Sequence, residues 1–174
     1  MPIDASKPAR SLGIAVVTVS DTRTEENDTS GHTLVERLQA AGHRLADKRI
    51  VKDDRAALRE LVLAWCAAPD IDVVLATGGT GLTGRDITPE VFEPLYDKPM
   101  PGFGELFRWL SFKDVATSTI QSRASGGLAG TTLLFCLPGS PRACRLAWDE
   151  ILVHQLDSRH SPCNLVELMP RFKE

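Results

Sequence analysis

Three short segments of the chain, residues 13–19, 71–76 and 131–137, are nearly continuous runs of apolar and β-branched residues. A strand with one face in water alternates apolar and polar side chains, whereas an unbroken apolar run is typical of a strand buried on both faces. Strands of that kind belong to parallel sheets that helices cover on both sides. The runs therefore favour an α/β fold.

Helical patterns separate these strands. A helix is predicted from about residue 30 to 41, where Gly42 would end it. A second helix follows from apolar residues spaced at i, i+3, i+4 and i+7, namely Leu58, Leu61, Val62 and Trp65. Residues 43–51 are a weaker, charged strand candidate, residues 88–118 are helical but interrupted by prolines, and a last helix runs to about Gln155. The alternation predicts a three-layer α-β-α sandwich with a mostly parallel central sheet, Rossmann-like in outline.

The length of 174 residues corresponds to one domain, at about 150 residues per domain. We predict a mobile arm over residues 1–11 and a single α/β domain over residues 12–156. Residues 157–174 carry Pro162 and Pro170 and little periodicity, so we expect an extended tail there.

Charge and hydropathy argue against several classes of protein. Twenty Lys and Arg against twenty-three Asp and Glu give a net charge of −3, which disfavours binding to duplex nucleic acid. The chain has no apolar run of the roughly 18 residues that a membrane span requires, and its N-terminal segment has no apolar signal core. We therefore expect a cytoplasmic protein with neither a nucleic-acid nor a membrane partner.

The cysteines and histidines form no metal-binding pattern. The four cysteines include no C-x-x-C pair, and the four histidines lack H-E-x-x-H or comparable spacing. We interpret the cysteines as buried or idle thiols. The sequence thus predicts neither a zinc site nor a histidine metal site.

Polar and glycine-rich turns follow each predicted strand. In an open parallel sheet, ligands bind beyond the carboxyl ends of the strands. Carboxylates beside glycine turns suit magnesium and phosphate chemistry, because Mg²⁺ takes one or two carboxylates together with phosphate oxygens. The residues that the strands deliver to this edge are Ser20 and Asp21, Asp53 and Asp54, residues 77–81 followed by Asp86, and residues 138–141.

The glycine loop, Thr77-Gly78-Gly79-Thr80-Gly81, is the most specific of these features. Its three glycines permit positive φ angles and let backbone N–H groups approach an anion closely. The loop lacks the G-K-[ST] ending of a Walker A motif and the G-x-G-x-x-G spacing of a dinucleotide fold. A plain tight turn is the alternative, but the nearby Asp86 favours an anion site.

The turn Pro138-Gly139-Ser140-Pro141 has two interpretations. Ser140 followed by Pro141 is a good helix start, with Ser as N-cap and Pro at the first helical position. The same start is an anion site, because free N–H groups and the helix dipole point outward. Taken alone, the cap is the better interpretation.

Each carboxylate also has a structural interpretation. Asp21 could cap a loop, and either Asp53 or Asp54 could cap the second helix. Thr88 precedes a proline and is a better cap for the next helix than Asp86. Asp86 is thereby left without an obvious structural role.

Two further features are candidates for a binding pocket. Arg123 either contacts a phosphate through two parallel hydrogen bonds or is simply exposed. Residues 100–108 contain Gly102 and Glu105 beside a phenylalanine, before a helix start. Alone this segment is typical of a loop, and beside the other motifs it is a candidate pocket wall.

Several motifs occur together in a fixed order, over about residues 12–160. They are Ser20-Asp21-Thr22-Arg23, Asp28-Thr29-Ser30-Gly31-His32, the glycine loop with Arg85-Asp86, Pro101-Gly102-Phe103-Gly104-Glu105, Ser122-Arg123, and Leu137-Pro138-Gly139-Ser140-Pro141. This combination resembles the MoaB/MogA/gephyrin molybdopterin-binding family. The Asp28–His32 loop and the segment Ser161–Asn164 are most similar to its bacterial MoaB branch.

The resemblance implies a three-layer α/β fold, a homotrimer or a hexamer built as a dimer of trimers, and a role in molybdenum cofactor synthesis. In catalytic members, the terminal phosphate of molybdopterin attacks the α-phosphate of Mg-ATP, giving adenylylated molybdopterin and pyrophosphate. The resemblance makes Asp21, Asp53 and Asp86 the catalytic residues around the nucleotide and Mg²⁺. The substrate-binding residues that it implies are Ser20, Thr77, Gly78, Gly79, Thr80, Gly81, Gly102, Glu105, Ser122, Arg123, Pro138, Gly139, Ser140 and Pro141.

Two other functions compete with adenylylation. Some members of the MoaB branch look degenerate as catalysts, so the first alternative is an inactive molybdopterin-binding or carrier protein. Retention of Asp21 and Asp86 favours activity. The second alternative, a dinucleotide-dependent oxidoreductase, is disfavoured because the motif spacing is wrong and only the fold class supports it.

Overall fold

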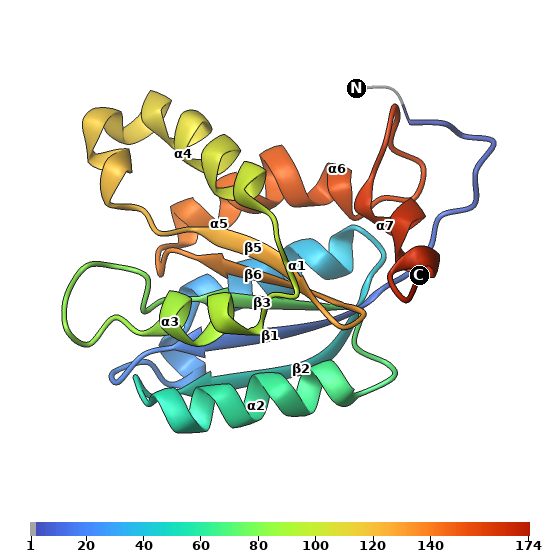
Figure 1. Ribbon diagram of the computed structural model, residues 1–174. Coiled ribbons are helices and arrows are strands. Elements are labelled where there is room, and N and C mark those ends of the chain that lie inside the picture. Colours follow the sequence, from blue (N-terminus) through green and yellow to red (C-terminus); the bar gives the residue numbers. More distant parts are fainter. Residues whose placement is uncertain (1–2) are drawn as a thin grey trace.

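Six strands form one sheet, in the order β2-β1-β3-β6-β5-β4, in a computed structural model that describes residues 3–174 (Figure 1). Met1 and Pro2, which belong to the predicted arm, lie outside the described residues. The strands are β1 (Gly13–Val19), β2 (Arg44–Val51), β3 (Val73–Thr77), β4 (Lys98–Pro99), β5 (Ser125–Ala129) and β6 (Thr132–Leu137).

The sheet is mostly parallel, as predicted. The pairs β1–β2, β1–β3 and β3–β6 are parallel, whereas β5 runs antiparallel to both β6 and β4. Strand β5 has the sequence Ser-Gly-Gly-Leu-Ala and was not expected, because it lacks the β-branched and aromatic residues that indicate a strand. Tight packing requires its glycines: a Cβ on Gly127 would lie 2.3 Å from the Tyr96 ring.

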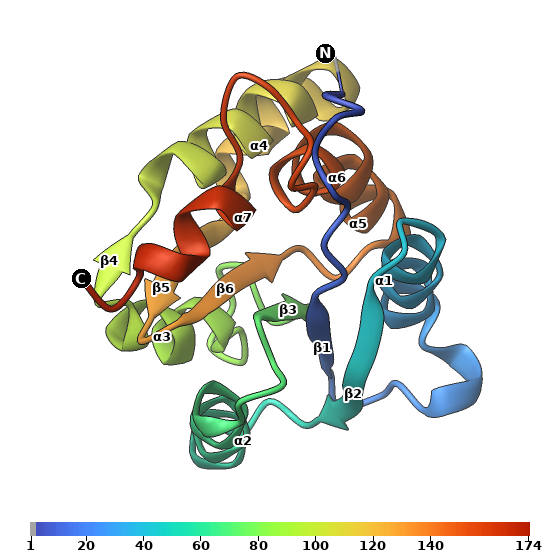
Figure 2. The same cartoon turned by 90° about the vertical axis from the view of Figure 1, so that its right-hand side faces the viewer.

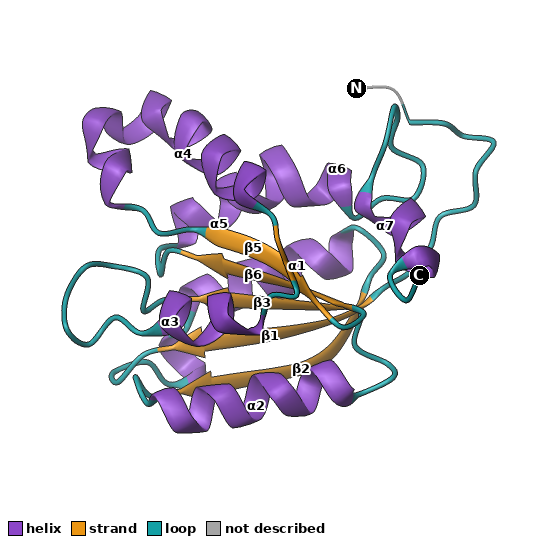
Figure 3. Cartoon of the chain, in the orientation of Figure 1, coloured by secondary structure: helices purple, strands orange, loops and turns teal. Residues whose placement is uncertain are grey.

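Helices cover both faces of the sheet, which confirms the three-layer sandwich (Figures 2 and 3). One face carries α1 (Thr29–Ala40), α4 (Pro101–Val115), α5 (Pro141–Ala147), the π-helical turn Trp148–Leu152, α6 (Val153–Gln155) and α7 (Leu165–Leu168). The other carries α2 (Arg55–Ala67) and α3 (Thr88–Phe92). Short 3₁₀ turns span Glu25–Asn27, Glu93–Leu95, Ala116–Gln121 and Met169–Arg171.

The two cores follow from the period-2 geometry of the strands. In β1, Ile14 and Val16 face the core under α1, α4 and α5, while Ala15 and Val17 face the core over α2 and α3. All four side chains are fully buried. This double burial explains why the strand is continuously apolar.

The C-terminal segment is not extended, so that prediction is wrong. It forms α7 and a 3₁₀ turn, and Val166 lies in the core with 3% of its surface exposed. A one-turn helix presents too few residues to show helical periodicity, which explains the error. The arm contacts this segment: Ile3 forms a β-bridge with His160, and the Asp4 amide donates to the Arg159 carbonyl over 2.9 Å.

No helix within residues 3–174 combines the length and apolar character needed to cross a bilayer.

Candidate functional site

The glycine loop leaves the end of β3 and lines a pocket of about 440 Å³ at the carboxyl edge of the parallel strands. Gly78 and Gly79 have φ angles of +96° and +61°, in the left-handed region that side chains disfavour. A Cβ on Gly78 would also lie 2.3 Å from the Val19 carbonyl oxygen. Glycine is therefore required at both positions.

The carbonyl groups of Gly78 and Gly79 accept hydrogen bonds from Thr88, while two N–H groups of the loop are free. Thr88 donates from its hydroxyl to the Gly78 carbonyl over 2.7 Å and from its amide to the Gly79 carbonyl over 2.9 Å. Among residues 3–174, the N–H groups of Gly79 and Thr80 donate to no other group. Successive free N–H groups in a concave turn form an anion-binding nest. The geometry therefore favours the anion site over a plain turn.

Thr88 is not the helix cap that the sequence predicts. The N-cap position of α3 is Ile87, and no side chain caps this helix. The Thr88 hydroxyl is fully buried and is used by the loop. A cap and a loop brace require the same residue types, so the sequence could not separate the two roles.

The second glycine turn packs directly on the first. A Cβ on Gly139 would lie 3.0 Å from the Gly78 Cα, and the buried Thr77 hydroxyl donates to the Pro138 carbonyl over 3.1 Å. Pro138 and Gly139 line the pocket. Ser140 caps α5 by accepting from the Ala143 amide, with Pro141 at the first helical position, so the predicted cap is confirmed.

The opposite wall of this pocket was missed from the sequence. It comes from the end of α4 and the following 3₁₀ turn, where serine and threonine hydroxyls occur without a recognisable motif. Its residues are Phe107, Ser111, Val115, Ser118, Thr119, Gln121 and the predicted Ser122.

The structure separates the roles of the two neighbouring aspartates before α2. Asp54 caps the helix, accepting from the amides of Ala56 and Ala57 over 2.8 and 3.0 Å. Asp53 instead faces the glycine loop: its Oδ1 lies 3.2 Å from where a Cβ on Gly79 would be. Burial, together with the negative charge of Asp86, raises the pKa of Asp53 above its ordinary value.

Asp86 has a structural role that the sequence did not reveal. Its Oδ2 accepts from the Thr83 amide and hydroxyl over 2.8 and 2.6 Å, which closes the loop between Gly81 and Asp86. Burial acts to raise the pKa of Asp86, but hydrogen bonds from Thr83 and Gly81 and the charge of Arg123 hold it below its ordinary value. Asp86 also lines the pocket.

Asp21 lies at the same edge but is already partnered. Its carboxylate pairs with Arg85 and accepts from the Asp53 amide over 3.4 Å, while Ser20 accepts from the amides of Thr22 and Arg23. Within residues 3–174, no three His, Cys, Asp or Glu side chains are grouped closely enough to hold a metal ion. The predicted three-carboxylate cluster is therefore not assembled by the protein alone.

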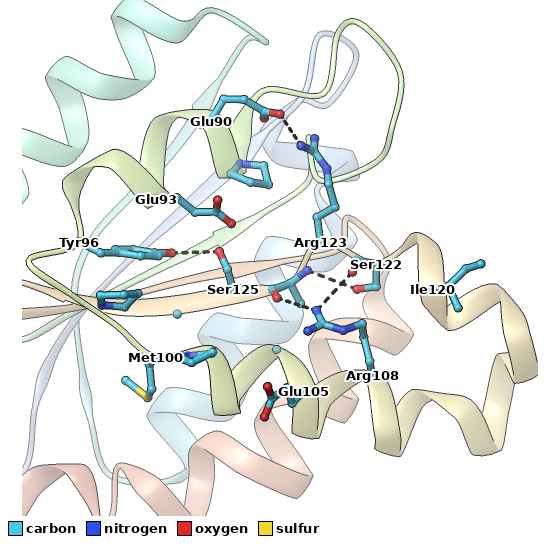
Figure 4. A pocket seen from close by; sticks show the side chains of 16 residues that line it. Glu90, Glu93, Tyr96, Met100, Glu105, Arg108, Ile120, Ser122, Arg123 and Ser125 are labelled. Carbon is cyan, nitrogen blue, oxygen red and sulfur yellow. Dashed lines mark hydrogen bonds and ion pairs between the residues drawn. The ribbon is translucent and has the colours of Figure 1, made fainter.

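Some of the remaining predicted residues line a neighbouring pocket of about 570 Å³ (Figure 4). Glu105 and Arg123 line it, and Ser122 lines both pockets. Gly102 lines neither of these and instead borders an apolar pocket of about 270 Å³ near α6.

Comparison with known proteins agrees with this geometry. Residues 15–158 match the family model described as a probable molybdopterin binding domain. The chain belongs to the molybdopterin-binding family. Molybdenum cofactor biosynthesis protein B of Escherichia coli K12 is 56% identical over 151 residues, which cover 87% of this chain and 89% of that protein.

Solved structures of the molybdopterin-binding family share the fold. A crystal structure of molybdenum cofactor biosynthesis protein B has a TM-score of 0.86 and 40% identity, covering 96% of this chain and 99% of that one. A structure from Thermus thermophilus, described as the molybdopterin biosynthesis enzyme MoaB, has a TM-score of 0.73 and 32% identity, covering 81% and 89% of the two chains. The expected family and fold are thus confirmed.

One of the motifs that suggested the resemblance, residues 28–32, has a structural role in this chain. The Asp28 carboxylate is fully buried, caps α1 by accepting from the Gly31 amide, accepts from the Thr18 hydroxyl and pairs with Lys48 at 2.9 Å. Its partners are therefore within the protein, and it fixes the start of α1 beside β1 and β2.

Proposed function

We propose that this member of the family binds molybdopterin in the glycine-loop pocket and adenylylates it with ATP, releasing pyrophosphate. The observation that carries the proposal is the pair of free N–H groups on Gly79 and Thr80, beside the carboxylates of Asp53 and Asp86. The N–H groups suit the terminal phosphate of the pterin, and the carboxylates suit a magnesium nucleotide.

The proposed reaction is a single displacement at phosphorus. An oxygen of the pterin phosphate attacks the α-phosphorus of ATP, and a new P–O bond forms. The bond from that phosphorus to the oxygen that bridges it to the β-phosphate breaks, and its electron pair leaves with pyrophosphate. The free N–H groups orient the attacking phosphate, and Ser122 borders it from the opposite wall.

The acidic residues fit Mg²⁺ when nucleotide phosphates complete its ligands. Oxygen donors from one or two carboxylates are what this ion takes from a protein, and Asp53 and Asp86 lie close enough for the charge of one to raise the pKa of the other. Mg²⁺ bound there would neutralise the charge of the departing pyrophosphate. We place Asp21 at the edge of the same nucleotide site, and we propose that the chain works as a homotrimer or hexamer.

A non-catalytic carrier is the second candidate. Two observations favour it: Asp21 is paired with Arg85, and the described residues that line the glycine-loop pocket include no lysine or arginine. Such a carrier would bind molybdopterin tightly without consuming ATP.

Anaerobic incubation with molybdopterin, ATP and Mg²⁺, followed by mass spectrometry, distinguishes the two. The matched variants are Asp86→Asn, which keeps an oxygen for the Thr83 donors, and Asp70→Asn, which changes an exposed aspartate paired with Arg44. We expect adenylylated pterin from the wild type and Asp70→Asn, with strong loss in Asp86→Asn. Pterin binding without product from any of the three would leave the carrier.

A further inference from the structure

Arg123 reaches the glycine loop from outside the pocket that the loop lines. It precedes β5, and because β5 runs antiparallel to β6, this position lies at the edge where β3 and β6 end. Its side chain is 26% exposed and borders the larger pocket, whereas Thr80 and Asp86 border the glycine-loop pocket. The guanidinium therefore lies in the wall between the two pockets.

All three nitrogens of this guanidinium are engaged. Nε donates to the Thr80 carbonyl over 3.2 Å, and one terminal nitrogen donates to the Asp86 carbonyl over 3.3 Å. The other terminal nitrogen pairs with Glu90 of α3, toward which Figure 4 shows the side chain extending. The two carbonyls come from the two ends of the segment Thr80–Asp86, so a single side chain holds both ends.

Arg123 adds to the hydrogen bonds with which Thr88 holds the glycine loop. Thr88 occupies the Gly78 and Gly79 carbonyls, and Arg123 occupies those of Thr80 and Asp86. The Gly78 and Gly79 carbonyls share their peptide units with the free N–H groups of Gly79 and Thr80, so Thr88 turns those groups to the opposite side. Arg123 holds the next peptide unit, whose Gly81 N–H is bound by Asp86, and so fixes the loop where it continues beyond the free pair. The planar, rigid fork of arginine suits this task, whereas the point charge of lysine does not.

We infer that Arg123 is a positioning residue, held by Glu90, that fixes the glycine loop in its anion-binding conformation and does not itself contact substrate phosphate. The inference rests on the proposed function for the identity of the anion, the terminal phosphate of molybdopterin. The bracing itself is a property of the protein without ligand.

The test compares Arg123→Met, Arg123→Lys and Glu90→Gln with the wild type and with Arg171→Met. Arg171 is a matched control, because it is exposed and pairs with Glu174 near the C-terminus. Hydrogen–deuterium exchange of the ligand-free proteins reports the loop, and dissociation constants are measured for molybdopterin and for its dephosphorylated form.

We expect faster exchange confined to residues 78–86 in all three variants, at amides that are hydrogen-bonded in the wild type, such as those of Thr83 and Asp86. We also expect about tenfold weaker binding of molybdopterin, the effect of losing a charged hydrogen bond. The dissociation constant of the dephosphorylated form should not change. Weaker molybdopterin binding without faster exchange would mean direct phosphate contact and would overturn the inference, as would equal loss for both ligands. If Arg123→Met fails to fold, the other two variants decide.

Failure of the proposed function would give a different result from failure of the inference about Arg123. A wild-type protein that makes no adenylylated product, or that does not bind molybdopterin, refutes that function. The exchange comparison in ligand-free protein still decides whether Arg123 braces the loop.

Discussion

The adjacent residues Asp53 and Asp54 should respond differently to replacement by alanine. Asp54→Ala removes two hydrogen bonds to the first turn of α2, of 2.8 and 3.0 Å. Asp53→Ala removes a carboxylate that faces the glycine loop and caps nothing. The first change should cost stability, and the second should cost activity.

The magnitudes follow from these contacts. Loss of an N-cap costs about 1 kcal/mol, which lowers Tm by about 2–4 °C in a chain of this size. Asp53→Ala should leave stability within about 0.5 kcal/mol or raise it slightly, because a like-charged neighbour is relieved. Under the proposed function, Asp53→Ala should lower the rate of adenylylation by about 10²–10³-fold, as for other lost electrostatic stabilisers.

The pH dependence gives an independent check. The pKa of Asp53 is raised in the folded protein, so above pH 3.8 the folded state holds its proton more tightly than the unfolded state does. Asp53 therefore lowers stability progressively as pH rises from about 3.8 through its folded pKa. The free energy of unfolding of wild type minus that of Asp53→Ala should fall over this window.

Urea unfolding followed by circular dichroism, repeated between pH 3.5 and pH 7, measures the stabilities of both variants, and mass spectrometry measures product. The assignment of roles is refuted if Asp53→Ala loses as much stability as Asp54→Ala, or if Asp54→Ala loses turnover while folded. A stability difference that is flat or rises with pH would contradict the environment assigned to Asp53.

Three other changes test the packing. Thr88→Val leaves the buried Gly78 carbonyl without its donor and should cost about 1–3 kcal/mol, while Thr88→Ser should keep most of that stability; equal urea midpoints for the two would contradict the brace. Gly127→Ala places a Cβ against the Tyr96 ring and should cost about 1–3 kcal/mol, so an unchanged Tm would show that Tyr96 moves aside freely. Burial raises the pKa of Cys136 to about 12 and that of Cys144 to about 11, so iodoacetamide at pH 8 should label the exposed Cys163 first; early labelling of either buried thiol by mass spectrometry would refute this.

The fold could be predicted from the sequence wherever burial alone determines which residue types are allowed. Strands β1, β3 and β6 lie between two cores, and only apolar side chains fit there. Strand β5 was not readable, because close approach of the Tyr96 and Phe135 rings selects its glycines. Helix α7 was missed because one turn is too short to show a period.

Candidate site residues could be predicted from the sequence where the backbone conformation determines the residue type. Gly78 and Gly79 need positive φ, so the glycine loop could be found from the sequence, and its assignment to an anion stays a prediction. Asp53 and Asp54 could not be separated, because either carboxylate could cap α2. The roles of Thr88 and Asp86 depend on partners that only the folded loop brings within reach.

The reversed direction of β5 enlarges the part of the chain that can contribute to the site. In an all-parallel sheet, every strand has its carboxyl end at the edge where ligands bind and its amino end at the opposite edge. Here the amino end of β5 brings Ser122 and Arg123 to that edge, while its carboxyl end leads away through Gly130 into β6. Two separate stretches of sequence therefore shape this edge: the turn after β3, and the segment before β5, whose Arg123 holds the carbonyls of Thr80 and Asp86.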